Sequence, residues 1–391
     1  MKSVHSAESE EATMGHQEAR RNILIIGTDF RNQGAYLMMA AAIEQIRRRF
    51  SGTPVLGARV GNPLQRHKVG ALTMLPVTSR IPRTALAQTL IPKARLIDHR
   101  DIDVVFDASG FFYSDSWKQF VDGRSALLQR FGELGTPIYF LPQAFGPFEN
   151  TSEASAAALS VARRAYPRDP SSLDHLQALA TKYSITTPIS TAPDFTCLVK
   201  GKKGDWGDLA GAVPIVPNYN IVARAPSSDH AKRYVRNLVE FALAARSAGR
   251  PVYGLSHEGR KDTKLLTEVA KQVKDFQIVD GFDGLELKTL LASSPYAVVG
   301  RFHAAVSCLS QATPLIAHGW SHKYEHLMAD FHQEKRLLDP FTALSPAEVK
   351  QYIDELENFA GAERVDLERC GAVYREGASR MWDEIERDVL S

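Results

Sequence analysis

Short apolar runs alternate with longer amphipathic stretches along most of this 391-residue chain, and no other feature constrains the fold as strongly. The apolar run at residues 23–26 ends at Gly27, and after a loop residues 35–49 have the apolar spacing of a helix. The same order recurs as predicted strands at 104–106 and 137–141 and predicted helices at 118–131 and 153–164. Because strands that alternate with helices form parallel sheets covered by those helices, the sequence predicts an α/β fold.

The alternation stops at residues 200–211 (KGKKGDWGDLAG), which are rich in glycine and charge, and then restarts. Chains longer than roughly 250–300 residues usually divide into domains, and such a break is typical of a domain boundary. Beyond it, strands are predicted at 213–216, 251–255, 296–299 and 314–317, and helices at 229–248, 263–273 and 303–310. The prediction is two doubly wound, Rossmann-like domains that face a cleft, with the ligand at the carboxyl ends of the strands.

This pattern divides the chain into four predicted segments. Residues 1–20 are polar and lack the apolar core of a secretory signal, so they are predicted to be a disordered tail. Residues 21–204 and 205–365 are predicted to form the N-terminal and C-terminal α/β domains. The helical pattern that begins near residue 346 continues to the end of the chain, and residues 366–391 are predicted to bridge the two domains.

Composition excludes several classes of partner. A net charge of +2, from 47 basic and 45 acidic side chains, produces no field that would recruit nucleic acid. Cys197, Cys308 and Cys370 stand too far apart for a metal site or a disulfide framework, which favours free thiols and a cytoplasmic location. No apolar run approaches the roughly 20 residues of a membrane span. Because HExxH, CxxC and clustered carboxylates are absent from the sequence, we predict neither a metal nor a cofactor.

Arg301 and His303 lie in the segment VVGRFHAA, directly after a predicted strand and at the start of a predicted helix. Free N–H groups and the helix dipole favour anions there. Arginine binds phosphate or carboxylate with two parallel hydrogen bonds, and histidine exchanges a proton near neutral pH. The structural alternative is that His303 caps the helix and Arg301 forms a salt bridge between domains.

Lys323 and Arg168 occupy equivalent positions after other predicted strands. Since the carboxyl ends of parallel strands lie at one edge of a sheet, we expect Arg168, Arg301 and Lys323 to converge on a small anion. The alternatives are a solvated surface lysine and, for Arg168, an ion pair with Asp169 or Asp174. Asp194, in the segment APDF, is predicted equally as part of a structural turn or as a carboxylate in the cleft.

Several further loops carry candidate residues for a second substrate. The loop GTDFRNQG contains Asn32 and Gly34 but is neither a GxGxxG motif nor a Walker motif. Small residues in the loop DASGF would let a ligand approach the backbone amides. That loop contributes Ser109 and Gly110, and Gln143 is expected to present an exposed amide. His257 and Glu258 could bind sugar hydroxyls or transfer a proton. Loop hydrogen bonds and surface turns are the structural alternatives.

Six segments, taken in order, resemble the polysaccharide pyruvyl transferase family over residues 23–328. They are IIGTDFRNQGAYLMMAA, DVVFDASGFFYSD, IYFLPQAFGPF, YPRDPSSLDHL, APDF and VVGRFHAAVSCLSQATPLIAHGWSHKYEHLM. The resemblance implies a two-domain, glycosyltransferase-B-like fold and the transfer of pyruvate from phosphoenolpyruvate onto a saccharide as a ketal, in exopolysaccharide or cell-envelope synthesis. It implies that Arg168, Arg301, His303 and Lys323 bind phosphoenolpyruvate, with His303 as the acid or base.

Two loops depart from the family pattern and bear on the acceptor. Many members carry N-x-G-D where this chain has NQGA (residues 32–35), and a glycine triplet where it has ASG (residues 108–110). Both loops are expected to shape the acceptor side, and a lipid-linked acceptor would bring the protein to a membrane surface. Two rival functions are a nucleotide-sugar glycosyltransferase of the same fold and a non-catalytic carbohydrate-binding protein.

Overall fold

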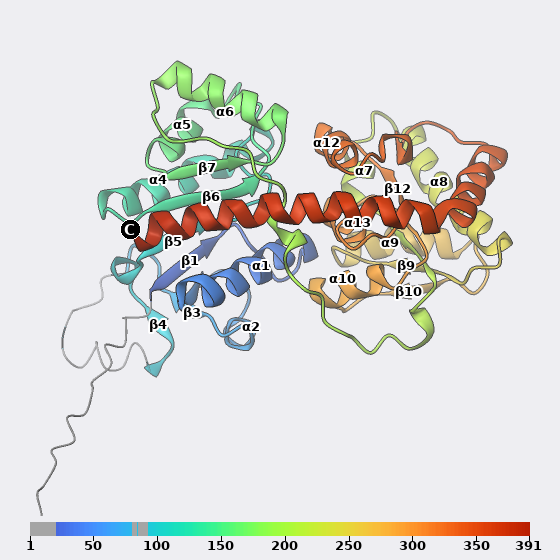
Figure 1. Ribbon diagram of the computed structural model, residues 1–391, viewed down its shortest axis with the longest axis horizontal. Helices are drawn as coiled ribbons and strands as arrows, with labels where there is room; N and C mark the ends of the chain where they lie inside the picture. The colour runs from blue at the N-terminus through green and yellow to red at the C-terminus, as the bar shows by residue number, and fades with distance from the viewer. Residues whose placement is uncertain (1–20, 80–83, 85–92) are drawn as a thin grey trace, which may run out of the picture.

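Two parallel sheets lie side by side along the molecule (Figure 1). The computed structural model describes residues 21–79, 84 and 93–391, so the predicted tail at 1–20 lies outside the described residues. The first sheet has the spatial order β4 (Leu96–Ile97), β3 (Leu72–Met74), β2 (Thr53–Gly57), β1 (Asn22–Ile26), β5 (Val104–Asp107), β6 (Ile138–Gln143) and β7 (Arg164–Pro167). The second has the order β10 (Gln277–Val279), β9 (Val252–Leu255), β8 (Val213–Val216), β11 (Ala297–Val299), β12 (Leu315–His318) and β13 (Leu337–Leu338).

The central strands of both sheets are buried along their whole length, as continuous apolar runs require of parallel strands. The helices associated with the first sheet are α1 (Gln33–Phe50), α2 (Pro63–Lys68), α4 (Lys118–Glu133), α5 (Ser152–Ser160) and α6 (Pro170–Tyr183). Those associated with the second sheet are α7 (Tyr219–Ala223), α8 (Ser228–Ser247), α9 (Arg260–Ala270), α10 (Gly284–Ala292), α11 (Phe302–Leu309) and α12 (His322–Asp330). This arrangement confirms the predicted α/β class.

In each sheet the direction in which successive strands are added reverses once. The site is expected at these reversals. In the first sheet the reversal lies between β1 and β5, which pair in parallel from Ile23 with Val104 to Ile26 with Asp107. In the second it lies between β8 and β11. Open parallel sheets bind ligands outside the carboxyl ends of the strands at such reversals. The loops that follow these four strands are therefore the places to look for a ligand.

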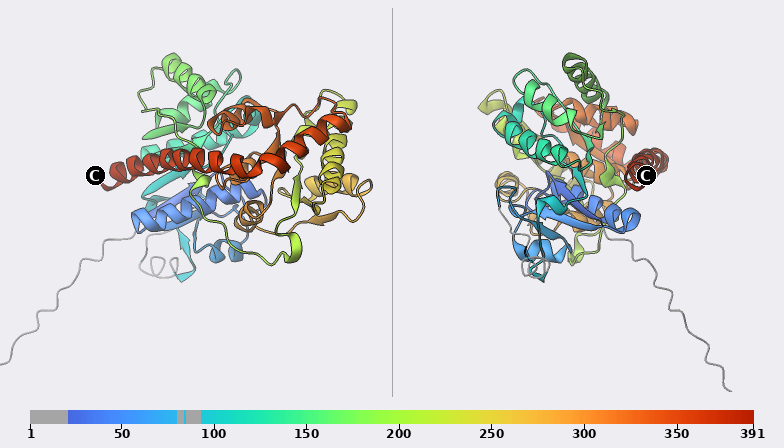
Figure 2. Two further views of the ribbon diagram at one scale, coloured as in Figure 1. Left: turned by 45° about the vertical axis from the view of Figure 1, so that its right-hand side comes forward. Right: turned by 90° about the vertical axis from the view of Figure 1, so that its left-hand side faces the viewer.

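One long helix, α13 (Pro346–Leu390), closes the chain and crosses both lobes (Figures 1 and 2). Its first part packs Val349 and Ile353 against the core of the second sheet. Its last part buries Trp382 against Phe106 of β5 and Phe195, with ring centroids 5.4 and 6.0 Å apart. The helix starts well before residue 366, where the predicted bridging segment begins, and the domain boundaries at 204 and 365 stay predictions.

The elements that sequence periodicity predicted lie within a few residues of their predicted bounds, with one overrun. The helix predicted at 153–164 ends at Ser160, and Arg164 already pairs with Tyr139 of β6 as the first residue of β7. No glycine or proline separates the two elements, so the sequence contains no mark of the turn. The predicted free thiols agree with the structure, in which Cys197, Cys308 and Cys370 are buried and unpaired.

Candidate functional site

A cavity of about 200 Å³ lies between the two sheets, where both strand reversals face each other. Loops after β1, β5, β8 and β11 contribute Asn32, Ser109, Asn218 and Arg301 to its wall. The remaining lining comes from α1, α11 and α12 and from the residues after β7, α7 and β9, and it includes Arg168, Arg224, His257, His303 and Lys323. The cations that the sequence places after separate strands thus reach one cavity, which we call the cationic pocket.

Arg301 is held on its own domain. Its Nε donates to Oδ2 of Asp262 at 3.0 Å, its Nη2 donates to the other oxygen of the same carboxylate, and its Nη1 donates to Glu258. Asp262 is fully buried, and its pairing with Arg301 leaves the guanidinium only 7% exposed. The structural alternative of a salt bridge at Arg301 is therefore observed, but both partners belong to α9 and the loop before it, so the bridge lies within the second lobe and not between domains.

Asp194 organises the opposite wall. This carboxylate is fully buried and accepts a hydrogen bond from Nη1 of Arg168 at 2.9 Å, while Nε2 of His303 lies 3.5 Å away. Thr196 donates to it from both its backbone nitrogen and its hydroxyl. The partner of Arg168 is thus Asp194 rather than Asp169 or Asp174, and Arg168 also lies over the Phe302 ring at 4.2 Å. Hence Asp194 fixes two of the candidate residues at once.

Lys323 differs from the two arginines because no ion pair to a carboxylate is seen for it within the described residues. Its ammonium instead lies over four aromatic rings: Trp320 at 5.1 Å, Phe302 at 5.3 Å, Phe111 at 5.6 Å and Tyr324 at 5.7 Å. Aromatic faces attract a cation but do not neutralise its charge. Lys323 therefore faces the cavity as an unneutralised cation.

Burial and mutual repulsion shift the pKa values of the ionisable groups in the pocket. Burial, followed by repulsion from Arg168, Arg224 and Arg301, lowers the pKa of Lys323 to about 7. Burial also lowers the pKa of His303 to about 4, although the attraction of Asp194 opposes that shift. These shifts give the pocket a neutral imidazole and a lysine that is half protonated near pH 7.

The residues predicted for the acceptor side divide into two groups. Asn32, Ser109, Gly110 and His257 line the cationic pocket. Gly34 lies just behind it, because a Cβ added there would sit 2.3 Å from Nδ1 of His303.

Two predicted residues lie outside the lining. Glu258 is occupied by Arg301. Gln143 is fully buried and donates to the backbone carbonyl of Asp107 at 3.3 Å, so the expectation of an exposed amide is wrong. Its position on β6, between β5 and β7, explains why solvent does not reach it.

The lining or supporting residues that were not predicted include four polar ones, Arg224, Asn218, Asn220 and Asp262. Arg224 is an exposed cation at the mouth, stacked over Trp320 at 4.8 Å, and it follows α7. Asn218 donates to the carbonyl of Gly300 at 2.8 Å, while Asn220 lies at the rim. Asp262 anchors Arg301. Asn218 lies just beyond the end of β8, after Pro217. This position after a predicted strand is the sequence signal that could have identified it.

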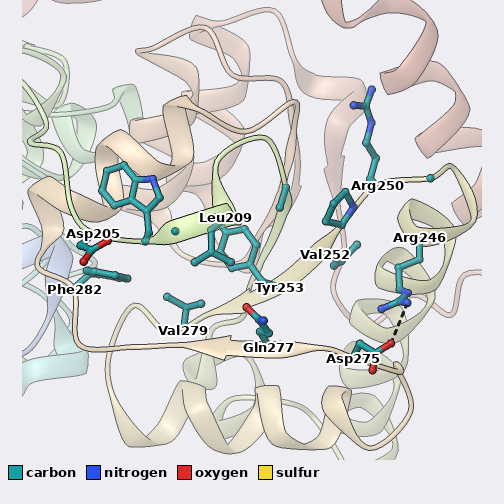
Figure 3. A pocket seen from close by; sticks show the side chains of 15 residues that line it. Asp205, Leu209, Arg246, Arg250, Val252, Tyr253, Asp275, Gln277, Val279 and Phe282 are labelled. Atoms are coloured by element: carbon teal, nitrogen blue, oxygen red, sulfur yellow. Dashed lines mark ion pairs between the residues drawn. The ribbon is translucent and has the colours of Figure 1, made fainter.

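Several larger cavities lie outside the cationic pocket, including one of about 260 Å³ between α8 and the start of α13. One of about 860 Å³ lies at the β9–β10 edge of the second sheet, lined by Leu209, Tyr253, Val279 and Phe282 with the Arg246–Asp275 ion pair at its side (Figure 3). Two of about 470 Å³ flank the pocket, one sharing His257 and the other sharing Arg168. Among the described residues, no cluster of His, Cys, Asp and Glu has the arrangement of a metal site.

Within the described chain, no helix combines the length and apolar character required to cross a bilayer, and this holds for α13 as well.

Several solved structures share this arrangement of elements. A putative UDP-N-acetylglucosamine 2-epimerase from Listeria monocytogenes matches with a TM-score of 0.59 and 10% identity over 94% of this chain and 96% of that chain. S. aureus MnaA, in a co-structure with UDP, gives 0.58 and 11% over 95% and 97%. Medicago truncatula UGT71G1 complexed with UDP-glucose gives 0.53 and 10% over 95% and 99%. At such low identity the likeness establishes the fold alone, which is of the glycosyltransferase-B type.

No curated protein matches the sequence. A family model does: polysaccharide pyruvyl transferase matches residues 32–322, which include every lining residue of the cationic pocket except Lys323 and Tyr324. This match covers most of the chain and agrees with the resemblance of the six sequence segments. The chain therefore belongs to the polysaccharide pyruvyl transferase family.

Proposed function

We propose that this protein transfers pyruvate from phosphoenolpyruvate to two hydroxyls of a saccharide, forming a ketal. The observation that carries the proposal is the charge of the cationic pocket. Arg168 is balanced by Asp194, and Arg301 by Asp262 and Glu258, whereas no carboxylate partner is seen for Lys323 or Arg224 in the described part of the chain. Such an excess of positive side chains around one pocket favours a small polyanion.

The size of the pocket favours this donor over a nucleotide sugar. Pockets for drug-sized ligands measure roughly 300–1,000 Å³, whereas the cationic pocket measures about 200 Å³. A nucleotide sugar would have to extend into the neighbouring cavity past Gln33, whose backbone nitrogen donates to the carbonyl of His257 at 3.3 Å. Phosphoenolpyruvate, with one phosphate and one carboxylate, fits the pocket without that displacement.

In the proposed reaction, protonation of the methylene carbon makes C2 of phosphoenolpyruvate electrophilic, and a sugar hydroxyl attacks it and loses its proton. The bond between C2 and the phosphate oxygen then breaks, phosphate leaves, and the second hydroxyl attacks C2 and loses its proton. One released proton replaces the proton given to the methylene carbon, and the other leaves with phosphate. The positive side chains stabilise the departing phosphate, which is where charge develops.

His303 is the proposed acid, and its environment connects that role to donor binding. The imidazole is neutral in the empty pocket because burial and the charges of Arg168 and Lys323 lower its pKa. A bound anion offsets those two charges, so donor binding raises the pKa of His303 and lets the ring take up a proton. The side chain thus becomes an acid only when the donor is present.

Two measurements test the proposal. Calorimetry should detect binding of phosphoenolpyruvate and no comparable binding of a uridine- or guanosine-diphosphate sugar. Incubation with phosphoenolpyruvate and a panel of nucleotide- and lipid-linked sugars should release phosphate and add the mass of a pyruvate ketal to one of them.

His303→Ala should abolish phosphate release while leaving donor affinity measurable, and unchanged turnover in that variant would refute the role of His303. Binding of the nucleotide sugars alone would favour the glycosyltransferase rival.

A further inference from the structure

An aromatic surface lies at the mouth of the cationic pocket. Trp117, at the end of the short helix η2 (Asp115–Trp117), lines the pocket and is 39% exposed. Phe120 beside it is 52% exposed. Exposing two large aromatic side chains costs free energy, since each would bury roughly 150–250 Å² in a core. A soluble domain that retains such a surface at the rim of a pocket commonly uses it for binding.

Trp117 is held in place by residues that reach the pocket. Its indole stacks on Phe112 with an interplanar angle of 14° and a centroid distance of 6.2 Å. The guanidinium of Arg124 lies 4.5 Å from the centre of the same Phe112 ring. Arg124 in turn donates to Ser109 at 2.7 Å and to the buried carboxylate of Asp107 at 3.2 Å. The indole is therefore a rigid surface connected to the pocket wall rather than a loose side chain.

The facing rim of the pocket is polar and belongs to the other sheet. Asn220 and Arg224 are exposed there, and Arg224 is itself positioned over Trp320 at 4.8 Å. Together the two rims offer an aromatic face on one side and hydrogen-bonding groups on the other. A pyranose ring has the matching character, since its C–H groups form an apolar face and its hydroxyls project from the edge.

We propose that Trp117 is the stacking platform for the acceptor saccharide, which lies across the mouth with its C–H face on the indole and two hydroxyls directed into the cationic pocket. Asn220 and Arg224 hydrogen-bond the hydroxyls on the far edge. This inference names the acceptor subsite of the reaction proposed above and rests on it. It also moves the acceptor contact away from Gln143 and Glu258, which lie outside the pocket lining.

The test compares Trp117→Ala and Trp117→Phe with wild type. A matched control is Phe359→Ala, because Phe359 is 61% exposed on α13 and does not line the pocket. Tryptophan fluorescence is titrated with oligosaccharides that end in glucose, galactose, mannose or N-acetylglucosamine, without phosphoenolpyruvate. Donor affinity is measured separately by calorimetry, and KM for the acceptor is measured where transfer occurs.

Trp117→Ala is expected to weaken saccharide binding and raise the acceptor KM about tenfold, as loss of one aromatic contact implies. Trp117→Phe should have an acceptor KM close to that of wild type, and Phe359→Ala should not differ from wild type. Donor affinity should change less than twofold in every variant. Saccharide binding that depends on Trp117 without any binding of phosphoenolpyruvate would remove the proposed function while supporting this subsite.

Three results would overturn the proposal. One is an acceptor KM that Trp117→Ala leaves unchanged. Another is the absence of any saccharide-induced fluorescence change in wild type across the panel. The third is a fluorescence change caused by phosphatidylglycerol vesicles and by no saccharide, because the aromatic surface would then be a membrane contact.

Discussion

Gly34 leaves no room for a side chain. An added Cβ would lie 2.3 Å from Nδ1 and 2.8 Å from Cγ of His303, although Gly34 lies within the first turn of α1 and alanine is the better helix former. Gly34→Ala is therefore expected to displace the imidazole and reduce kcat strongly, while the free energy of unfolding changes by no more than about 1 kcal/mol. Turnover assays and denaturant unfolding of the same preparation measure the two effects.

Gly123→Ala is the matched control for this prediction. Gly123 lies inside α4, and no atom comes within 4 Å of a Cβ added there, so the change should stabilise the protein by about 0.5–1 kcal/mol without affecting turnover. If Gly34→Ala kept full activity, the close contact between α1 and His303 would have no part in catalysis.

The pKa of Lys323 predicts a pH dependence of donor binding. Because burial lowers this pKa to about 7, the ammonium is charged below pH 7 and increasingly neutral above it. Affinity for phosphoenolpyruvate should accordingly be constant or rise up to about pH 7 and then fall by as much as tenfold per pH unit. Calorimetry between pH 6 and 9 measures this fall, and in buffers of different ionisation enthalpy it should also show proton uptake above pH 7.

Lys323→Arg provides the comparison, because a guanidinium stays charged throughout this pH range. The variant should retain donor binding at pH 8.5 relative to pH 6.5, even if its affinity at pH 6.5 is lower. A decline with pH that is the same in both proteins would assign the titration to another group.

Sequence reasoning located the cations of the pocket more readily than their partners. Arg301 follows β11 closely, and Lys323 lies in the first turn of the helix after β12, so their position at a sheet edge depends only on local pattern. The carboxylates that hold the arginines come from distant segments: Asp194 lies 26 residues from Arg168, and Asp262 lies 39 residues from Arg301. Such pairings are set by tertiary packing within each lobe, which no local period reveals.

At the scale of elements, predictability followed the length and burial of each strand. Residues 213–216 and 104–106 were predicted as strands because long buried runs stand out from their surroundings. By contrast, β3, β10 and β13 contain three residues or fewer, and no residue of β10 is buried, so they contain too few apolar residues to establish a period. The strands beside the reversal points were therefore predictable, whereas β2 and β3 inside the first sheet and the edge strands β10 and β13 were not predicted.

The helix α13 stabilises the first lobe through Trp382. This side chain is fully buried, and Arg49 of α1 is bound nearby by Asp383 at 2.6 Å and Glu386 at 2.7 Å. Trp382→Ala should lower the free energy of unfolding by about 3–5 kcal/mol, as removal of a buried tryptophan usually does. Denaturant unfolding measures the loss. Phe359→Ala on the same helix should change it by less than about 0.5 kcal/mol, and equal effects of the two variants would contradict the bridging role.

At the scale of the whole molecule, α13 also connects the core to the pocket. The hydroxyl of Tyr374 on α13 accepts a hydrogen bond from the backbone nitrogen of Asp194 at 3.1 Å, and Asp194 holds Arg168 beside His303. The helix that crosses both lobes thus also holds the turn at Asp194, whose carboxylate positions Arg168 in the pocket.

Buried histidines predict how the stability of the whole protein depends on acid. Burial is the main cause that lowers the pKa of His257 to about 3 and those of His303 and His318 to about 4. Because the unfolded chain binds these protons near pH 6.5, the free energy of unfolding should fall as pH drops from about 6.5 to 4, by up to about 1.4 kcal/mol per pH unit for each histidine. His318 lies outside the pocket, packed edge-on against Tyr234 and Phe241. His318→Phe should therefore reduce the pH slope measured by urea unfolding while leaving donor affinity intact, and a slope equal to that of wild type would show that His318 does not titrate on unfolding.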